Sequence, residues 1–446
     1  MHPIDVFARY ASEFRDGRLS GEVLHHAKRA VIDWHAALFP GLDADPVPRL
    51  RRVLADDLDR GGARLPGGRA ATWRAAALLN GTAAHAAEVD DSFRDAMYHP
   101  GAATVAAALA TAQQLGTDGL GFLRGVVMGY EVSTRIGVAL GRAHYRHWHN
   151  TGTVGTFGAA AATAGLLGLH GAPFGHALAT AATFAAGLQQ AFRMDSMSKP
   201  LHAGRAAEAG VLAAQLAAEG VTGSRDVLDG DAGLGRAMSD GPDWSTVGDT
   251  LGRDFHITRL TFKNHIGCGH TFAAIDAALE LVRRHGLRPA GIRRVRVATY
   301  GPALDIACHQ EPATENEARF SLRFVVATAL VHGSVRLEAY TPQRLADADV
   351  RAMMARITAV VDPAIDAAFP ARRSARVEIE TMSGELQAWL QPDRKGDPEL
   401  PLSDTELDGK FLELASPVLG AAGARALLVR LWSLDAAPEG ALARLF

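Results

Sequence analysis

The sequence of 446 residues has little cysteine and no excess of charge. Two cysteines, Cys268 and Cys308, are too few for a disulfide framework, so we expect a reducing, cytoplasmic environment. The 46 Lys and Arg residues are balanced by 49 Asp and Glu residues. A nucleic-acid-binding protein normally carries a strong basic excess, so we expect no nucleic acid among the partners.

Targeting and cofactor motifs are missing as well. Residues 1–17 carry acidic and arginine side chains without an apolar run, so no secretory signal is expected. The sequence contains no Walker A pattern, no dinucleotide-binding fingerprint and no Gly-x-Ser-x-Gly elbow. Nucleotide-dependent and redox-cofactor chemistry therefore lack support.

One long stretch, 150–192, lacks Asp, Glu, Lys and Arg. A membrane hairpin is one interpretation, because about 20 apolar residues can span a bilayer. The stretch is, however, rich in Ala, Gly and Thr, and Gly171-Ala172-Pro173 interrupts it. We therefore interpret it as two buried helices whose small side chains allow close packing, and we expect no membrane contact.

What the sequence does have is ample apolar material for a core. Hydrophobic residues make up 48% of the chain and charged residues 21%, with a formal net charge of -3. This composition is typical of a globular protein and excludes disorder as its main state. The length suggests two or three domains.

Residues 1–258 are predicted to form an all-α domain, because no strand alternation is found there. Between 22 and 38, apolar residues recur at three- and four-residue spacing until Pro40-Gly41. Further helices are predicted at 72–87, 102–115, 118–140, 155–169, 176–191 and 204–219.

The pattern changes at about residue 259, and we predict a smaller α+β domain over 259–396. Alternation with period two predicts strands at 294–300, 335–340 and 376–381. Helical patterns lie at 271–285, 319–332 and 343–358. Residues 397–446 are again helical, at 403–415 and 422–433, and are expected to pack back on the first domain. The predicted fold class is mainly α with an α+β module.

Five polar clusters interrupt the sequence, and the fifth, Cys308-His309-Gln310, is interpreted as structural. The first contains Glu88, Asp90, Asp91, Ser92 and, beside a Pro-Gly turn, His99. Acids and a histidine so close together could supply acid/base groups. In the alternative interpretation, Asp91 or Ser92 caps a helix and His99 lies in a surface loop.

The second cluster consists of His144, His147 and His149. Their spacing suggests a metal site, although loop histidines at such spacing are often coincidental. His149 also precedes the glycine-rich helix entrance Asn150-Thr151-Gly152. There it could face a bound anion at a helix N-terminus or take part in acid/base chemistry.

The third cluster places Lys199, His202 and Arg205 within seven residues, where a predicted helix opens. Cations beside free backbone N–H groups favour carboxylate or phosphate binding. The alternative is a solvated loop. We favour a functional role, because the flanking sequence is buried in character on both sides.

The fourth cluster contains Lys263, His265, Cys268 and His270, at the junction between the helical and α+β domains. The His-x2-Cys-x-His spacing superficially suggests zinc. It matches no common structural zinc pattern, and no second Cys/His pair follows. We prefer the interpretation in which a lysine and a histidine of this cluster line an interdomain cleft.

Taken in order, these clusters resemble the MmgE/PrpD family, which includes 2-methylcitrate dehydratases, cis-aconitate decarboxylases and iminodisuccinate epimerases. The matching pieces are Asn80-Gly81, His85, Glu88-Val89-Asp90-Asp91-Ser92, His99-Pro100, His149-Asn150-Thr151-Gly152-Thr153, Ser196-Met197-Ser198-Lys199, Leu201-His202-Ala203-Gly204-Arg205-Ala206-Ala207, Phe262-Lys263, Cys268-Gly269-His270 and Ala274-Ile275-Asp276. Their order and separations cover nearly the whole chain.

The resemblance implies a large all-α helical domain completed by the C-terminal helices, a smaller α+β lid domain and a homodimer. It places the active site in the cleft between the domains and implies no metal or organic cofactor. Family substrates are small di- and tricarboxylates. Lys199, Arg205 and Lys263 suit carboxylates, and the histidines and acids suit proton transfer beside one.

The resemblance can be carried over residue by residue. The expected catalytic residues are Glu88, His99, His149, Lys199 and Lys263. The expected substrate-binding residues are Asp90, Ser92, His202, Arg205, His265, Cys268 and His270. Of these, Ser92 matches a family threonine that hydrogen-bonds the substrate.

Three departures from the family pattern bear on the reaction. The first acidic position, usually Asp, is Glu88. Cys268 stands where the decarboxylases have a lid histidine, and Phe324 stands where they have a tyrosine. These two losses argue against cis-aconitate decarboxylation and leave dehydration and epimerisation open. Both begin with removal of a proton alpha to a carboxylate, which requires lysines that stabilise the enolate.

We therefore expect a cofactor-independent lyase or isomerase that acts on a small polycarboxylate. Two other hypotheses stay open. The substitutions just described would also fit a catalytically impaired family member that binds a metabolite. The three histidines between 144 and 149 would suit a zinc hydrolase.

Overall fold

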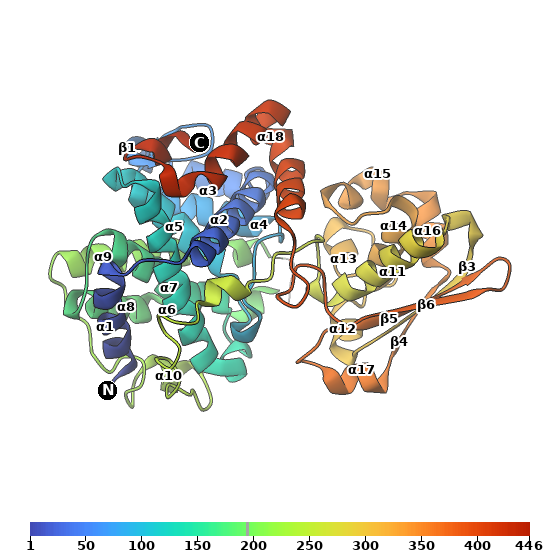
Figure 1. Ribbon diagram of the computed structural model, residues 1–446, viewed down its shortest axis with the longest axis horizontal. Coiled ribbons are helices and arrows are strands. Elements are labelled where there is room, and N and C mark those ends of the chain that lie inside the picture. The colour runs from blue at the N-terminus through green and yellow to red at the C-terminus, as the bar shows by residue number, and fades with distance from the viewer. Residues whose placement is uncertain (193–195) are drawn as a thin grey trace. The chain divides into compact units, whose positions relative to one another are not determined.

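The computed structural model describes residues 1–192 and 196–446, and the chain forms two compact units. Unit 1 comprises 1–261 and 403–446, and unit 2 comprises 262–402. Unit 2 is therefore an insertion in the chain of unit 1, and the C-terminal helix α18 lies among the N-terminal helices of unit 1 (Figure 1). The predicted domain boundaries lie after residues 258 and 396, and the two units are divided after residues 261 and 402.

Unit 1 consists mainly of helices (Figure 1). They are α1 (Pro3–Asp16), α2 (Gly21–Gly41), α3 (Val47–Val53), α4 (Trp73–Ala86), α5 (Pro100–Leu115), α6 (Gly119–Tyr145), α7 (Asn150–Leu166), α8 (Ala172–Phe184), α9 (Ser198–Ala218), α10 (Leu234–Met238) and α18 (Asp404–Trp432). Several begin where a side chain caps the first turn: Ser20 accepts from the amide of Val23, and Thr72 accepts from the amide of Ala75.

The prediction that this part of the chain contains no strand was wrong. A small antiparallel hairpin joins β1 (Leu58–Arg64) to β2 (Ala70–Ala71). Two side chains of α5 also bind the backbone of β1: Gln114 accepts from the amide of Gly62 at 2.8 Å, and Gln113 from that of Arg64 at 2.9 Å. Hydrogen bonds from distant side chains leave no trace in the alternation of apolar residues, so the strand escaped prediction.

The core of unit 1 forms around α7, which packs against α5, α6, α8 and α9. Every residue from 150 to 164 is buried. The small residues predicted to allow close helix packing do so. A Cβ atom on Gly158 of α7 would overlap the hydroxyl of Thr104 in α5 and crowd that of Ser133 in α6. The uncharged stretch from residue 150 onward thus forms core helices.

The C-terminal helix α18 packs along α2. Non-helical angles at Gly420 (φ 69°, ψ 156°) divide it, in agreement with the two predicted helical segments. Within the described residues, α18 is the one helix long and apolar enough to cross a membrane, judged by length and composition alone.

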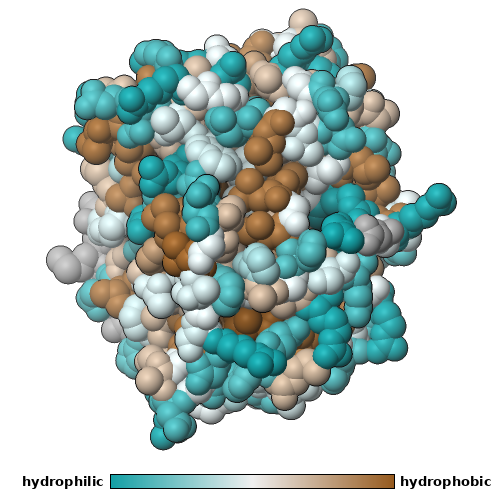
Figure 2. All heavy atoms as spheres, turned by 90° about the vertical axis from the view of Figure 1, so that its left-hand side faces the viewer, coloured by the Kyte–Doolittle hydropathy of each residue, from teal (hydrophilic) through white to brown (hydrophobic). Residues whose placement is uncertain are grey.

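Figure 2 views the side of the molecule that is on the left in Figure 1, where several separate apolar areas lie among polar ones.

Unit 2 is an α+β module, as predicted. Its elements are α11 (Phe272–His285), β3 (Ile292–Thr299), α12 (Gly301–Ile306), α13 (Glu315–Arg319), α14 (Leu322–His332), α15 (Pro342–Leu345), α16 (Ala348–Met354), β4 (Ile357–Val361), α17 (Pro363–Ala368), β5 (Ala375–Thr381) and β6 (Leu386–Gln391). The strands form one mixed sheet in the order β4-β3-β5-β6, with β3 parallel to β4 and antiparallel to β5. Helix α11 packs on β5 and β6.

Two predictions within unit 2 were wrong. Residues 335–340 do not form a strand, because the segment is enclosed between the left-handed helix end at Gly333 and Pro342, and it closes into a short 3-10 helix at Leu337–Tyr340. The helix predicted at 343–358 breaks into α15 and α16, and the chain then enters β4. The valines and the isoleucine of β4 favour a strand once this segment can pair with β3.

Lys410 of α18 is a buried cation that connects the C-terminal helix to the rest of unit 1. Its Nζ atom lies 2.6 Å from Oδ1 of Asp33 in α2 and 2.7 Å from the carbonyl oxygen of Val89. The side chains of Lys410 and Asp33 are 2% and 0% exposed. At such burial, a charge that loses its partner is strongly unfavourable.

We expect Lys410→Met to lower the free energy of unfolding of unit 1 by about 3–5 kcal/mol, because it removes one member of a buried ion pair. The double variant Asp33→Leu/Lys410→Met removes both charges and should recover much of this loss. Guanidinium unfolding followed by circular dichroism measures both. A single variant as stable as the wild type would show that the ion pair is not needed.

Candidate active site

The loop between α4 and α5 forms the centre of the candidate site. It leaves α4 through Glu88, whose φ of 59° lies in the left-handed region, at a cost of about 1–2 kcal/mol for a non-glycine residue. Lys410 then holds the carbonyl of Val89, and Ser92 pairs with Thr261 in an antiparallel bridge. A strained backbone that surrounding contacts keep in place is a frequent property of functional sites.

Four histidines from four helices come together beside this loop. His85 lies in the last turn of α4, and His99 and His149 are the N-cap residues of α5 and α7. His202 lies near the start of α9. The ring centroid of His85 is 5.0 Å from that of His99 and 5.5 Å from that of His149. The ring centroids of His149 and His202 are 5.2 Å apart. We call these four residues the histidine cluster.

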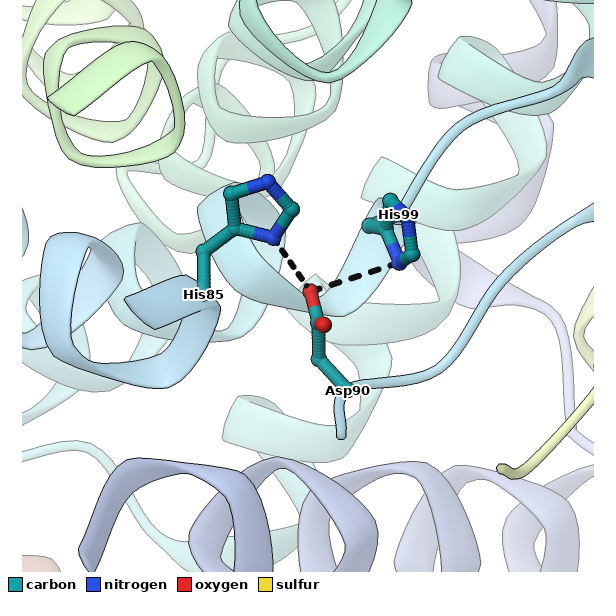
Figure 3. A group of neighbouring side chains, drawn as sticks. All are labelled: His85, Asp90 and His99. Atoms are coloured by element: carbon teal, nitrogen blue, oxygen red, sulfur yellow. Dashed lines mark hydrogen bonds and ion pairs between the residues drawn. The ribbon is translucent and has the colours of Figure 1, made fainter. Parts of the chain in front are cut away.

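Asp90 lies between two members of the histidine cluster (Figure 3). Its Oδ2 atom is 2.7 Å from Nδ1 of His85 and 3.4 Å from Nδ1 of His99. Nδ1 of His99 is also 2.6 Å from the carbonyl oxygen of Asp91. Because a carbonyl oxygen only accepts, Nδ1 of His99 carries a proton, and in the neutral ring the lone pair is on Nε2. His99 is therefore in the tautomer whose Nε2 atom can accept a proton from a substrate.

His149 and His202 form a second pair, with their Nδ1 atoms 3.0 Å apart. Burial, followed by the charges of His85 and Lys199, lowers the pKa of His149 well below its ordinary value. The same causes lower the pKa of His202 to about 4. Both rings are thus neutral near pH 7, and one Nδ1 donates while the other accepts.

Lys199 forms an ion pair with Glu88 at the edge of the histidine cluster. The two side chains are 22% and 25% exposed, so they remain accessible to a small molecule. Lys199 is the second residue of α9, and His99 and His149 cap α5 and α7. Three helix N-termini, each with a partial positive charge, therefore supply groups to the site, which favours an anionic ligand.

Asp91 supports the loop from behind. Its carboxyl group accepts from the amide of Gly101 at 3.0 Å and from the hydroxyl of Tyr130 at 2.7 Å. Burial, with the nearby negative charge of Asp33 as the next cause, raises the pKa of Asp91 to about 8. This carboxyl group therefore holds a proton near pH 7, and its role is to fix the loop.

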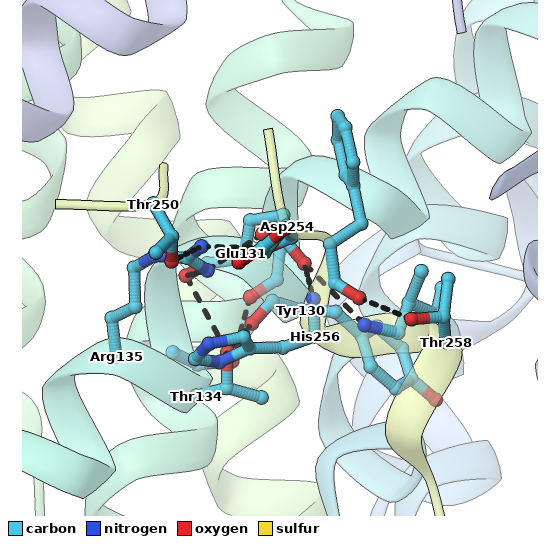
Figure 4. Close-up of polar contacts among 12 residues, drawn as sticks. Tyr130, Glu131, Thr134, Arg135, Thr250, Asp254, His256 and Thr258 are labelled. Atoms are coloured by element: carbon cyan, nitrogen blue, oxygen red, sulfur yellow. Dashed lines mark hydrogen bonds and ion pairs between the residues drawn. The ribbon is translucent and has the colours of Figure 1, made fainter. Parts of the chain in front are cut away.

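A second buried network holds the segment that pairs with Ser92 (Figure 4). Oε1 of Glu131 accepts from the amide of His256 at 2.6 Å, and Oε2 accepts from Arg135 at 2.6 Å. Burial raises the pKa of Glu131 to about 7, although Arg135 opposes this shift. The ring of His256 stacks on Phe93 at 5.1 Å, which connects the network to the loop.

The other two predicted residues of unit 1 make contacts outside the histidine cluster. Arg205 is on the exposed side of α9, where it pairs with Glu208. Ser92 is placed by its backbone bridge to Thr261. The structure brings together Glu88, Asp90, His99, His149, Lys199 and His202.

The distances alone would allow a metal ion among His85, Asp90 and His99, whose ligand atoms lie within 4.8 Å of one another. The nitrogen of His99 that lies next to Asp90 is, however, Nδ1, which donates to the carbonyl of Asp91 and therefore has no lone pair for a metal.

The three histidines proposed as a zinc set are not gathered. The ring nitrogens of His144 contact the carbonyl of Met238 and the hydroxyl of Thr153, and His147 is exposed. His149 belongs to the histidine cluster instead, where its Nδ1 meets His202. The spacing in the sequence therefore does not correspond to a common site.

The remaining predicted residues belong to unit 2. Lys263 is buried, and His265 is fixed by a 2.7 Å contact of its Nε2 with Asp276. Burial raises the pKa of the Cys268 thiol to about 11, so this group stays protonated and is a weak nucleophile. Nδ1 of His270 lies 2.9 Å from the hydroxyl of Tyr300.

Sequence reasoning named His85 as a matching position but not as a site residue. It offered Asp91 as a helix cap, in agreement with its contact to the amide of Gly101 at the start of α5, and it missed Tyr130 and Lys410 as supports. His85 is three residues before Glu88, and its approach to His99 and His149 depends on helix packing. A lysine more than 300 residues beyond Val89 could not be connected to this loop by any local pattern.

The fold and the site define a protein with a helical unit, an inserted α+β unit and a histidine-rich, anion-favouring centre. The sequence matches the MmgE/PrpD N-terminal domain over residues 5–247 and the MmgE/PrpD C-terminal domain over residues 265–434. The chain belongs to the MmgE/PrpD family.

Three relatives are similar along most of the chain. A cis-aconitate decarboxylase-like protein from Aspergillus oryzae is 28% identical over 92% of this chain and 90% of its own. The cis-aconitate decarboxylase of Homo sapiens is 26% identical over 93% of this chain and 88% of its own. The enzyme of the same name from Mus musculus is 28% identical over 77% of this chain and 72% of its own.

The raised pKa of Asp91 predicts a pH-dependent stability. Between the ordinary pKa of 3.8 and about 8, the folded state binds more protons at Asp91 than the unfolded state does. The contribution of Asp91 to stability therefore falls as pH rises, by at most about 1.4 kcal/mol per pH unit. Asp91→Asn should reduce this decline between pH 5 and 8.

Chemical unfolding at several pH values measures the slope for the wild type and the variant. Asp56→Asn, which changes an exposed aspartate of unit 1, is the matched control and should keep the wild-type slope. Parallel curves for wild type and Asp91→Asn would mean that Asp91 is already ionised in the folded protein at pH 5.

Proposed function

We propose that this protein is a cofactor-independent lyase or isomerase that removes a proton from the carbon next to a carboxylate of a small di- or tricarboxylate. The observation that carries the proposal is the meeting of His99, His149 and Lys199, each at a helix N-terminus, beside the strained loop at Glu88. The names of the relatives support a lyase-type reaction on a polycarboxylate.

The chemistry follows from the tautomer of His99. Nε2 of His99 carries the lone pair and is the proton acceptor, while Asp90 and the carbonyl of Asp91 orient the ring through Nδ1. The conjugate imidazolium forms beside Asp90, whose negative charge stabilises it. This arrangement provides a base without any bound ion.

Lys199 supplies the positive charge that an enolate requires. As the proton leaves, negative charge grows on the substrate carboxylate, and a fixed ammonium group stabilises that charge more than it stabilises the ground state. Glu88 keeps Lys199 in place in the free protein. The resemblance to the family gives Lys263 of unit 2 a corresponding role.

Decarboxylation of cis-aconitate is the second candidate reaction, because three relatives carry that name or a similar one. Two residues of unit 2 weigh against it. The thiol of Cys268 is buried and protonated, and Phe324 is a fully buried ring that packs near Tyr340. Neither can act as the acid or base that a histidine or tyrosine would supply there.

Deuterium exchange tests the proposal directly. The protein is incubated in deuterated water with citrate, 2-methylcitrate, cis-aconitate and an amino-dicarboxylate, and the recovered acids are analysed by mass spectrometry. We expect deuterium at the alpha carbon of at least one acid, and loss of the exchange in His99→Gln. Loss of water identifies a dehydratase, loss of carbon dioxide a decarboxylase, and exchange without either an epimerase.

His147→Gln is the matched control, since it changes an exposed histidine outside the cluster, and it should exchange like the wild type. No exchange with any acid, by a folded wild-type protein, would refute the proposal and favour a metabolite-binding protein without catalysis.

The two lysines predict a loss of rate without a loss of fold. Lys199→Met and Lys263→Met each remove one charge and keep most of the side-chain stem. Loss of a charge that acts on the developing enolate should reduce turnover by on the order of 100-fold. Glu88→Gln should reduce the rate more than it weakens binding. Near-normal turnover in folded Lys199→Met and Lys263→Met proteins would remove both lysines from the mechanism.

We also propose a homodimer without a metal or organic cofactor, on the basis of the family. Light scattering during size-exclusion chromatography measures the first, and elemental analysis the second. Stoichiometric zinc that survives chelation would overturn the cofactor-independent reaction.

A further inference from the structure

The segment that carries His270 in unit 2 is held rigidly from outside. Arg394 is 4% exposed and donates to the carbonyl of Gly269 at 3.1 Å, while its other nitrogens bind both oxygens of Asp397. The hydroxyl of Tyr340 donates to the carbonyl of Ile266. The backbone next to His270 is therefore fixed, and the ring can be placed accurately.

The ring of His270 is oriented by Tyr300. Its Nδ1 atom lies 2.9 Å from the Tyr300 hydroxyl, which is fully buried. The Tyr300 ring stacks on Phe369 with centroids 4.6 Å apart, so the phenol cannot turn away. Within the described residues, His270 is the hydrogen-bond partner of this hydroxyl.

This contact determines the tautomer of His270. A buried O–H group must donate, because a proton without an acceptor costs free energy. If the Tyr300 hydroxyl donates, Nδ1 of His270 holds the lone pair, and the ring proton is on Nε2. His270 is thus expected to have its proton on the nitrogen opposite to that of His99.

Two arginines act on His270, and one of them, Arg394, is paired with Asp397. Burial, with the charges of Arg373 and Arg394 as the next causes, lowers the pKa of His270 to about 3, so the ring is neutral at physiological pH. The charges of Arg373, Lys263 and Arg394 also act on Cys268. His270 itself is only partly buried. A neutral N–H donor near these arginines suits a carboxylate.

We propose that His270 binds a substrate carboxylate through Nε2–H, and that Tyr300 is the positioning residue that imposes this tautomer. The identity of the ligand as a polycarboxylate rests on the proposed function. In this proposal, the hydrogen-bond donor to the carboxylate is His270 and not Cys268, whose thiol is buried. Tyr300 has no access to the substrate, and its effect passes through the imidazole.

Nitrogen NMR of full-length protein with labelled histidine tests the tautomer. We expect the Nε2–H form for His270 from pH 5 to 8, identified by the loss of its signals in His270→Gln. Tyr300→Phe keeps the ring and its stacking on Phe369 and should give a mixture of tautomers. Tyr340→Phe, which removes another buried hydroxyl of unit 2, is the matched control and should leave the tautomer unchanged.

Citrate binding, measured by calorimetry, tests the contact with a carboxylate. The amide nitrogen of Gln reaches about as far as Nε2 of histidine, so His270→Gln should bind citrate within a few-fold of the wild type. His270→Asn reaches only as far as Nδ1 and should bind about tenfold more weakly or worse, as should His270→Leu. Tyr300→Phe should show an intermediate loss.

The two proposals can fail separately. An Nδ1–H tautomer in the wild type, or a tautomer unaffected by Tyr300→Phe, overturns the positioning role. Equal citrate binding by wild type and His270→Asn, or none by either, overturns the carboxylate contact. Each result is independent of deuterium exchange, whose absence would refute the proposed function alone.

Discussion

The close approach of α4, α7 and α9 is the constraint on which the candidate site depends. Gly204 lets α9 touch α4, and Gly152 lets α7 pass beside His202, where a Cβ would meet the His202 side chain and the backbone of Ala186. Only at this separation can Nδ1 of His149 and Nδ1 of His202 lie 3.0 Å apart. The small residues of these helices therefore serve the chemistry as well as the packing.

The same packing explains the electrostatics of the site. Buried imidazoles lose their solvation, so His149 and His202 stay neutral, while Lys199 and Glu88 form an ion pair at the edge. Neutral imidazoles inside and an ion pair at the rim would suit the carboxylate ligand of the proposed function. Loop strain at Glu88 is balanced by contacts that come from three other parts of unit 1.

Much of this could be predicted from the sequence, because local patterns determine local structure. Apolar spacing placed the long helices of unit 1 and the strands β3 and β5, and the clusters at residues 88–99, 149 and 199–202 meet in space. The prediction of a strand at 335–340 failed where six residues between two turns alternated by chance. Lys410 and the tautomer of His99 could not be foreseen, because they depend on contacts between residues far apart in the chain.

The hydrogen bond from Lys410 to the carbonyl of Val89 has a consequence for the order in which the protein folds. On the ribosome, the loop at Glu88 emerges early, whereas Lys410 is synthesised only after the whole of unit 2. The loop residues are therefore synthesised long before the lysine that contacts them. Until α18 is synthesised, Lys410 cannot bind the carbonyl of Val89 or the carboxylate of Asp33, and the loop lacks this contact.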